Sequence, residues 1–172
     1  MSVKKILTEP NKLLRQVSKS VDKVGDEERK LMDDMLDTMY DAPGIGLAAI
    51  QIGVPKRIIV MDISKDEDKK EPRYFVNPVI KNRNKEKAKY EEGCLSVPDQ
   101  FAEIERPNTC EVEYLDYNGK KKLLKADGLL ATCIQHEMDH LEGILFIDYL
   151  SKLKKSMIIK RLSKAKSTRI VV

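Results

Sequence analysis

The two histidines of this 172-residue chain stand four positions apart, in the segment His136-Glu137-Met138-Asp139-His140. On a helix, residues four apart lie on one face about 6 Å from each other, so two imidazoles can bind the same metal ion. Glu137 can then act as a general base toward a water at that ion. Chance placement gives this pattern in only about 0.1% of such chains. A metal site is therefore favoured over the alternative that the two histidines are merely packed or solvated. This segment must therefore be a helix to which the rest of the fold brings further groups.

A catalytic site of the zinc type needs a third protein ligand and one open position. The chain has no third histidine, and Phe146 stands where one metalloprotease pattern places it. Glu142 points to another face of the helix than His140. Asp148 follows too closely for the usual returning helix, but it stays open as an alternative.

Three cysteines are an odd number for a disulfide framework, so each thiol is judged on its own. Cys133 precedes His140 by seven residues, which is about 10.5 Å of helical rise, and we expect it to line the cavity wall. Cys110 lies in an alternating apolar pattern typical of a buried strand. Cys94 lies in a loop whose glycine allows close backbone approach, and its thiolate is a soft metal ligand. Cys94 is therefore the strongest candidate for the third ligand.

Composition indicates one globular domain over residues 1–172, because 41% of the residues are hydrophobic and 35% are charged. No apolar run approaches the length of a membrane-spanning helix. The start of the chain, 1–12, has no apolar stretch typical of a signal peptide, so we expect a cytoplasmic protein.

Apolar periodicity predicts an α+β domain, with antiparallel strands around a central helix that carries 136–140, and a C-terminal helix. We expect helices over 26–42, 127–141 and within 151–172; strands over 57–63, 73–80, 109–114 and 120–124; and polar stretches or loops over 64–72, 81–89 and 91–98.

The tail 151–172 contains six lysines and two arginines but no acidic residue, so it carries a charge of +8 and the remainder carries −4. Leu153, Met157, Ile158, Leu162 and Ala165 recur in it at helical spacing. Such a tail can bind RNA or an acidic partner, or it can be only a solvated helix face.

Three segments resemble the signature motifs of peptide deformylases, in the same order: GIGLAAIQ at 44–51, EGCLS at 92–96 and QHEMDH at 135–140. The resemblance covers nearly the whole chain. Members of that family remove the formyl group from the N-terminal formylmethionine of new polypeptides.

The resemblance implies that Cys94, His136 and His140 bind one divalent metal ion, with a water as the fourth ligand that Glu137 activates. Ligand chemistry alone favours zinc. The resemblance instead implies Fe²⁺ in the cell, with Zn²⁺, Ni²⁺ or Co²⁺ able to occupy the site in a purified sample.

The resemblance also assigns a role to Gln51, for which the residues alone suggested none. Its side-chain amide and the backbone N–H of Leu95 would bind the oxyanion. An added β-strand of substrate would be held by backbone groups. The expected substrate contacts are Ile45, Gly46, Gly93, Leu129 and Cys133.

Two positions depart from familiar members of the family. Phe101 stands where several bacterial relatives carry arginine, and Thr132 replaces a larger aliphatic residue of the methionine pocket. The peptide preference beyond formylmethionine is therefore left open.

Two other functions are weighed against this one: a small zinc endopeptidase, and a binding protein that has kept the metal fold without catalysis. The expected partners are formylmethionyl nascent peptides and, through the basic tail, the ribosome surface. We expect a monomer that does not bind membranes.

Overall fold

The computed structural model describes residues 2–171, with side chains up to Lys164. The side chains of Ala165 and Lys166, expected to belong to the tail's apolar stripe and basic charge, lie outside the described residues. The elements are η1 (Lys12–Arg15), α1 (Asp26–Asp41), β1 (Gly46–Ala48), η2 (Ala49–Ile52), β2 (Ile58–Met61), β3 (Arg73–Arg83), β4 (Lys87–Cys94), β5 (Val97–Pro107), β6 (Thr109–Leu115), β7 (Lys121–Asp127), α2 (Gly128–Leu141), η3 (Phe146–Tyr149) and α3 (Lys152–Val171).

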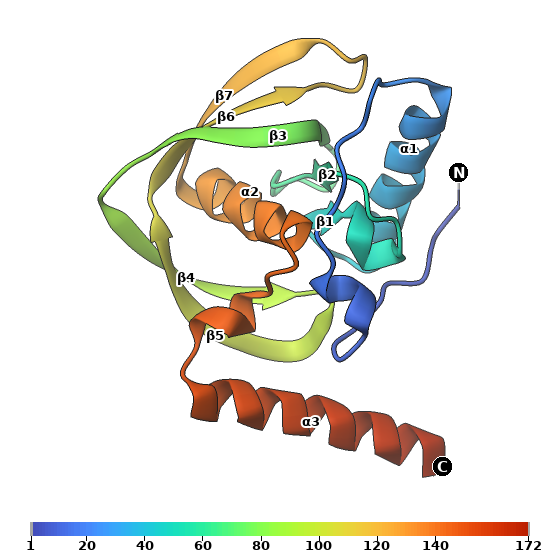
Figure 1. Cartoon of the computed structure of the whole chain (residues 1–172), viewed down its shortest axis with the longest axis vertical. Coiled ribbons are helices and arrows are strands. Elements are labelled where there is room, and N and C mark those ends of the chain that lie inside the picture. The colour runs from blue at the N-terminus through green and yellow to red at the C-terminus, as the bar shows by residue number, and fades with distance from the viewer. Residues whose placement is uncertain (1, 172) are drawn as a thin grey trace.

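The strands form two antiparallel sheets on either side of α2 (Figure 1). One sheet has five strands in the order β1-β2-β3-β6-β7, and the other is the β4–β5 ribbon. α1 packs its methionines against β1 and β2. This arrangement confirms the predicted α+β fold with antiparallel strands around the histidine helix.

α2 is buried on nearly all sides, which explains how its polar residues come to lie inside the protein. Ile134 and Leu141 pack into the core with β2, β3 and β6. His136, Glu137 and His140 are also buried, although they are polar. Buried polar side chains need partners, so the helix brings chemically active groups to a site inside the fold.

The prediction for residues 81–98 was wrong. Instead of polar stretches and loops, β3 continues to Arg83 and the β4–β5 ribbon covers most of the remainder. In β4 the inward row consists of Ala88, Tyr90 and Glu92. Because this row is short and ends in a glutamate, apolar alternation could not reveal the strand.

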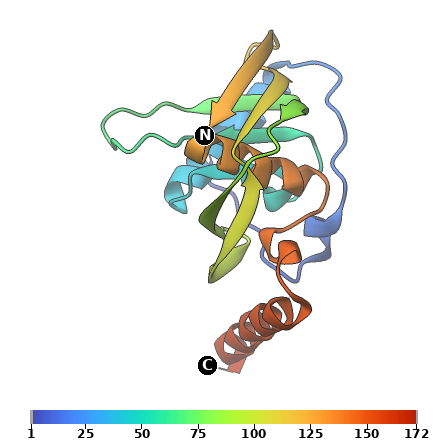
Figure 2. The ribbon, with the colours of Figure 1, turned by 90° about the vertical axis from the view of Figure 1, so that its left-hand side faces the viewer.

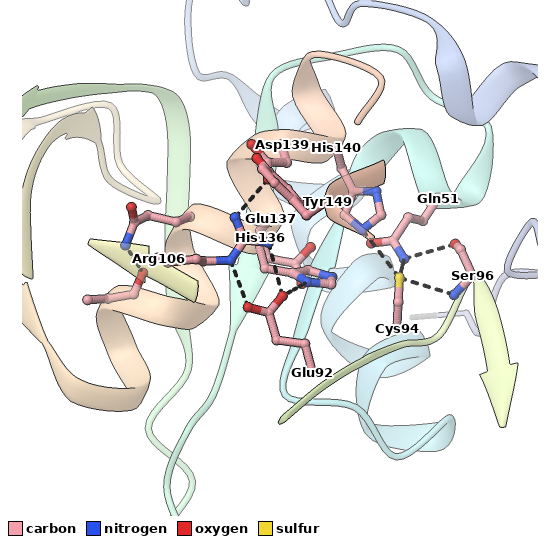
Figure 3. A network of polar contacts seen from close by, with 12 residues as sticks. Gln51, Glu92, Cys94, Ser96, Arg106, His136, Glu137, Asp139, His140 and Tyr149 are labelled. Atoms are coloured by element: carbon pink, nitrogen blue, oxygen red, sulfur yellow. Dashed lines mark hydrogen bonds and ion pairs between the residues drawn. The ribbon is translucent and has the colours of Figure 1, made fainter. Parts of the chain in front are cut away.

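A buried network of ion pairs joins the β4–β5 ribbon to α2 and η3 (Figure 3). Arg106 donates to both carboxylate oxygens of Glu92, at 2.7 and 3.0 Å, and to Asp139 at 2.8 Å. The Tyr149 hydroxyl donates to the same Asp139 carboxylate at 2.7 Å. Although burial works to raise the pKa of Glu92, hydrogen bonds from His136 and Arg106 hold it below its usual value. The network therefore contains a charged carboxylate in the interior.

α3 lies outside the body of the protein, against β5 and η3 (Figures 1 and 2). Ile158 is buried and Leu162 is partly buried against this part of the core. Leu153 is 72% exposed and Met157 is 44% exposed. The predicted apolar stripe is therefore divided between a docked and an exposed side. Within 2–171 no helix is long and apolar enough to cross a membrane.

Replacing Arg106 by Met is expected to lower the free energy of unfolding by about 3–5 kcal/mol, because the Glu92 carboxylate is left buried without its cation. Denaturant unfolding of the metal-loaded protein measures this loss. Lys89→Met is the matched control in the same ribbon: it breaks the exposed pair between Lys89 and Glu103 and should cost almost nothing. A loss as small as the control's would show that the fold does not depend on the network.

Candidate active site

Three side chains from two elements converge at the centre of the molecule. Cys94 lies at the end of β4, while His136 and His140 lie one turn apart on α2; their potential ligand atoms are all within 4.8 Å of one another. The Cys94 Sγ lies 3.4 Å from Nε2 of His140. A thiolate with two imidazoles is a donor set that suits Zn²⁺, Fe²⁺, Co²⁺ or Ni²⁺, so these residues fit a divalent metal ion. Cys110 lies in the core away from this cluster.

The orientation of His136 is fixed by Glu92. Its Nδ1 donates to Oε1 of Glu92 at 2.9 Å, which directs Nε2 toward the cluster (Figure 3). Histidines that bind metals commonly donate their second nitrogen to a carboxylate in this way. Sequence reasoning assigned no role to Glu92, although it stands in the EGCLS segment. Arg106, which holds Glu92, carries no local sequence signal at all.

Glu137 is enclosed at the edge of the cluster. Its Oε1 lies 4.0 Å from Nε2 of His136, and Oε2 is buried with no hydrogen-bond partner among the described residues. Burial raises the pKa of Glu137 to about 7, although a positively charged His136 would lower it. A carboxyl group with such a pKa can both accept and return a proton near neutral pH.

Gln51 extends from η2 toward the cluster. Its Oε1 accepts the backbone N–H of Ala48 at 2.9 Å, which directs the amide nitrogen toward Ser96 Oγ at 3.0 Å and Cys94 Sγ at 3.6 Å. The amide nitrogen of Gln51 therefore faces Cys94, one of the three ligand candidates (Figure 3). Ser96 was not among the predicted site residues.

A cavity of about 660 Å³ opens beside this cluster. Phe101, 64% exposed, stands at the rim. Its ring lies against Gly93 so closely that a Cβ there would be 2.5 Å from it. The cavity is lined by Thr132 and by all the residues predicted to contact the substrate. These predicted contacts are Ile45, Gly46, Gly93, Leu129 and Cys133.

Comparison with known proteins agrees with this geometry. The polypeptide deformylase family model matches residues 3–156. A peptide deformylase of Pelagibacter ubique is 88% identical over 172 residues, covering 100% of both chains. That of Rhizobium meliloti is 56% identical and covers 98% of this chain and 97% of its own.

A solved structure gives the same result. The crystal structure of peptide deformylase from Ehrlichia chaffeensis superposes with a TM-score of 0.94 at 46% identity, and the match covers 98% of this chain and 99% of that one. The similarity thus extends through both sheets and all three α-helices. The chain belongs to the polypeptide deformylase family, the metal-dependent hydrolases that remove the formyl group from the N-terminal formylmethionine of new polypeptides.

Proposed function

We propose that Cys94, His136 and His140 hold one divalent metal ion per chain, and that this ion is Fe²⁺ in the cell. The metal dependence of the family and the convergence of the three donors support the site. The same donor set accepts Zn²⁺, Ni²⁺ and Co²⁺, so we expect these ions in protein purified in air. Metal analysis of protein prepared under anaerobic conditions, with activity measured for each ion, tests the assignment.

The buried carboxyl of Glu137 is the observation that carries the mechanism. When bound, the ion lowers the pKa of a water toward about 7 and so supplies a nucleophile near neutral pH. Glu137 takes the proton as the nucleophile attacks the formyl carbon, and it returns the proton to the amine nitrogen as the C–N bond breaks. Its enclosure and its pKa of about 7 suit both steps.

Gln51 and Leu95 stabilise the negative charge that develops on the formyl oxygen. The side-chain amide of Gln51 and the backbone N–H of Leu95 donate hydrogen bonds to it. The direction of the Gln51 amide nitrogen, toward Cys94 and Ser96, supports this role. The oxygen therefore meets one donor from η2 and one from the turn between β4 and β5.

The substrate peptide adds to the open edge of β1 as a β-strand. β1 is an edge strand that pairs with β2, and the Asp62 N–H donates to the Ile45 carbonyl at 2.9 Å. Along an antiparallel strand, residues alternately direct their N–H and C=O toward the neighbouring strand and away from it. Because the Ile45 carbonyl bonds to Asp62, the N–H and C=O of the next residue, Gly46, point away from β2. Ile45 contributes its side chain at the cavity rim, and Gly93 borders the peptide from β4.

The methionine side chain enters the cavity beside Leu129 and Cys133. Both line the cavity together with Thr132, whose small side chain leaves room for an unbranched thioether. Phe101 borders the following residues of the peptide at the rim. These contacts select the first residue more strictly than the later ones.

Release of formate from formyl-Met-Ala-Ser tests the activity directly. The Fe²⁺-loaded protein under anaerobic conditions is expected to produce formate and Met-Ala-Ser. Acetyl-Met-Ala-Ser is the control and should stay intact, because we expect the buried side chains of Gln51 and Glu137 to leave room only for hydrogen on the far side of the carbonyl. Cleavage between residues of the peptide would instead indicate an endopeptidase.

We further propose that residues 1–172 form a single catalytic domain that acts as a monomer. All candidate ligands, donors and bases belong to one chain, which supports this assignment. Its substrates are nascent peptides, so we place it in the bacterial cytoplasm, where ribosomes supply them.

The basic helix α3 is proposed to bind the ribosome surface. Lys154 and Lys160 are exposed on it, and Leu153 and Met157 offer apolar contacts beside them. The exit region of the ribosome is coated with RNA phosphate, which attracts such a charge. Docking there would keep the enzyme close to emerging formylated chains.

Glu137→Ala is expected to lower kcat by about 10²–10⁴-fold, because the proton acceptor is lost, while the metal content stays at one ion per chain. Steady-state formate release and metal analysis measure the two effects. Glu91→Ala removes another carboxylate from the cavity wall and should leave kcat unchanged. A Glu137→Ala enzyme within tenfold of the parent would rule out this residue as the base.

Cys94→Ser is expected to abolish stable metal binding, because a hydroxyl replaces the thiolate ligand. Metal content after dialysis is the measurement. Cys110→Ser and Cys133→Ser are the matched controls and should retain about one ion per chain. A Cys94→Ser protein that stays fully loaded would mean that the third ligand lies elsewhere.

Substitution tests the ribosome proposal better than deletion of the tail, because Ile158 of α3 packs into the core. Lys154→Glu with Lys160→Glu should abolish co-sedimentation with ribosomes and leave hydrolysis of a short formyl-peptide unchanged. Binding by the parent should fall steeply between about 50 and 200 mM salt.

The matched control for these charge reversals is Lys65→Glu with Lys69→Glu, in the exposed loop after β2. Loss of co-sedimentation in both double variants would indicate nonspecific attraction. Retention in the α3 variant would show that the tail is only a solvated helix face.

A further inference from the structure

The two donors proposed for the oxyanion lie next to different sheets. Gln51 follows β1, at the edge of the five-stranded sheet, and Leu95 lies in the turn of the β4–β5 ribbon. Among the strands of residues 2–171, no ladder joins one sheet to the other. Their separation therefore has to be set by something other than strand pairing.

The N-terminal segment bonds to both sides. The Leu7 N–H donates to the Gln51 carbonyl at 2.7 Å, and the Glu9 N–H donates to the Ser96 carbonyl at 2.8 Å. In an extended segment the N–H groups of residues two apart point to the same side. One short piece of backbone thus bridges Gln51 and the residue directly after Leu95.

This segment is itself held at both ends. On one side the Lys4 N–H donates to Oγ1 of Thr38 in α1, at 2.8 Å. On the other side Arg15, the last residue of η1, donates to Asp148 of η3 at 2.6 Å. Between these anchors Ile6 lines the cavity. The segment runs from the N-terminus toward η1 in Figure 1. It is therefore a fixed part of the site's wall.

We propose that residues Ile6–Glu9, here called the strap, position the oxyanion donors by setting the distance between Gln51 and the Cys94–Ser96 turn. This inference rests on the oxyanion role proposed above for Gln51 and Leu95. Ile6 borders the cavity, but the N–H groups of Leu7 and Glu9 bond to Gln51 and Ser96, so the strap acts on the reacting groups through the residues it holds. A displacement of about 1 Å between reacting groups can cost about 10²-fold in rate, so loss of one strap bond has a measurable effect.

Leu7→Pro removes the N–H that the Gln51 carbonyl accepts. We expect kcat of the metal-loaded enzyme to fall by about 10²-fold, with KM and metal content unchanged, because substrate and metal are held by other groups. Lys5→Pro is the matched control: it places the same ring at an exposed position of the N-terminal segment and should behave as the parent. A second variant, in which chemical ligation replaces only the Leu7 amide by an ester, removes the N–H while keeping the leucine side chain.

A double-mutant cycle with Gln51→Ala separates positioning from general destabilisation. If the strap acts through Gln51, Leu7→Pro should lower kcat little further once the Gln51 amide is gone. Equal loss in both backgrounds, or parental kcat for both the proline and the ester variants, would overturn the inference.

The same cycle distinguishes failure of the strap from failure of the proposed function. A Gln51→Ala enzyme with parental kcat would remove the oxyanion role itself, and the strap's role with it. A slow Gln51→Ala enzyme beside fully active strap variants would overturn the strap alone.

Discussion

A buried guanidinium sets the geometry on which the rest of this molecule depends. Arg106 holds Glu92, Glu92 holds Nδ1 of His136, and the histidine can then present only its other nitrogen to the cluster. The same arginine reaches Asp139 on α2. One charged side chain thus fixes both the ribbon that carries Cys94 and the helix that carries the histidines. Its burial is costly, but it lets the protein itself set the orientation of His136 through Glu92.

In the proposed complex, backbone groups and side chains recognise different parts of the substrate. Main-chain groups at the edge of β1 suit any peptide sequence, because every residue offers an N–H and a C=O. In the proposed complex, side chains from α2 and the ribbon enclose the first residue and the reacting bond. An enzyme that must accept the N-terminus of almost any new protein needs this combination of a general strand site and one selective pocket.

How far the sequence alone predicts such a site depends on how far apart along the chain the interacting residues lie. The histidine helix and α1 follow from local periodicity, since 3.6 residues per turn place their apolar and functional residues on definite faces. The cluster of Cys94 with the two histidines could be anticipated because few other ligand types were left in the chain. The partnership of Glu92 with Arg106 could not, because it depends on the register of a ribbon whose inward row looks polar. The strap was equally hidden, since its bonds use backbone groups that every sequence possesses.

Gly46 carries a consequence for evolution and for inhibitor design. A Cβ at this position would lie 2.6 Å from Oε1 of Glu137 and 3.0 Å from both Cγ and Cδ. Glu137 is buried beside Gly46, so a methyl group there would force its carboxyl to move. In the proposed complex, the residue that offers its main chain to the peptide is therefore also the residue that the proposed base contacts. A side chain added there to exclude a peptide-like inhibitor would therefore also displace the carboxyl that we propose as the base.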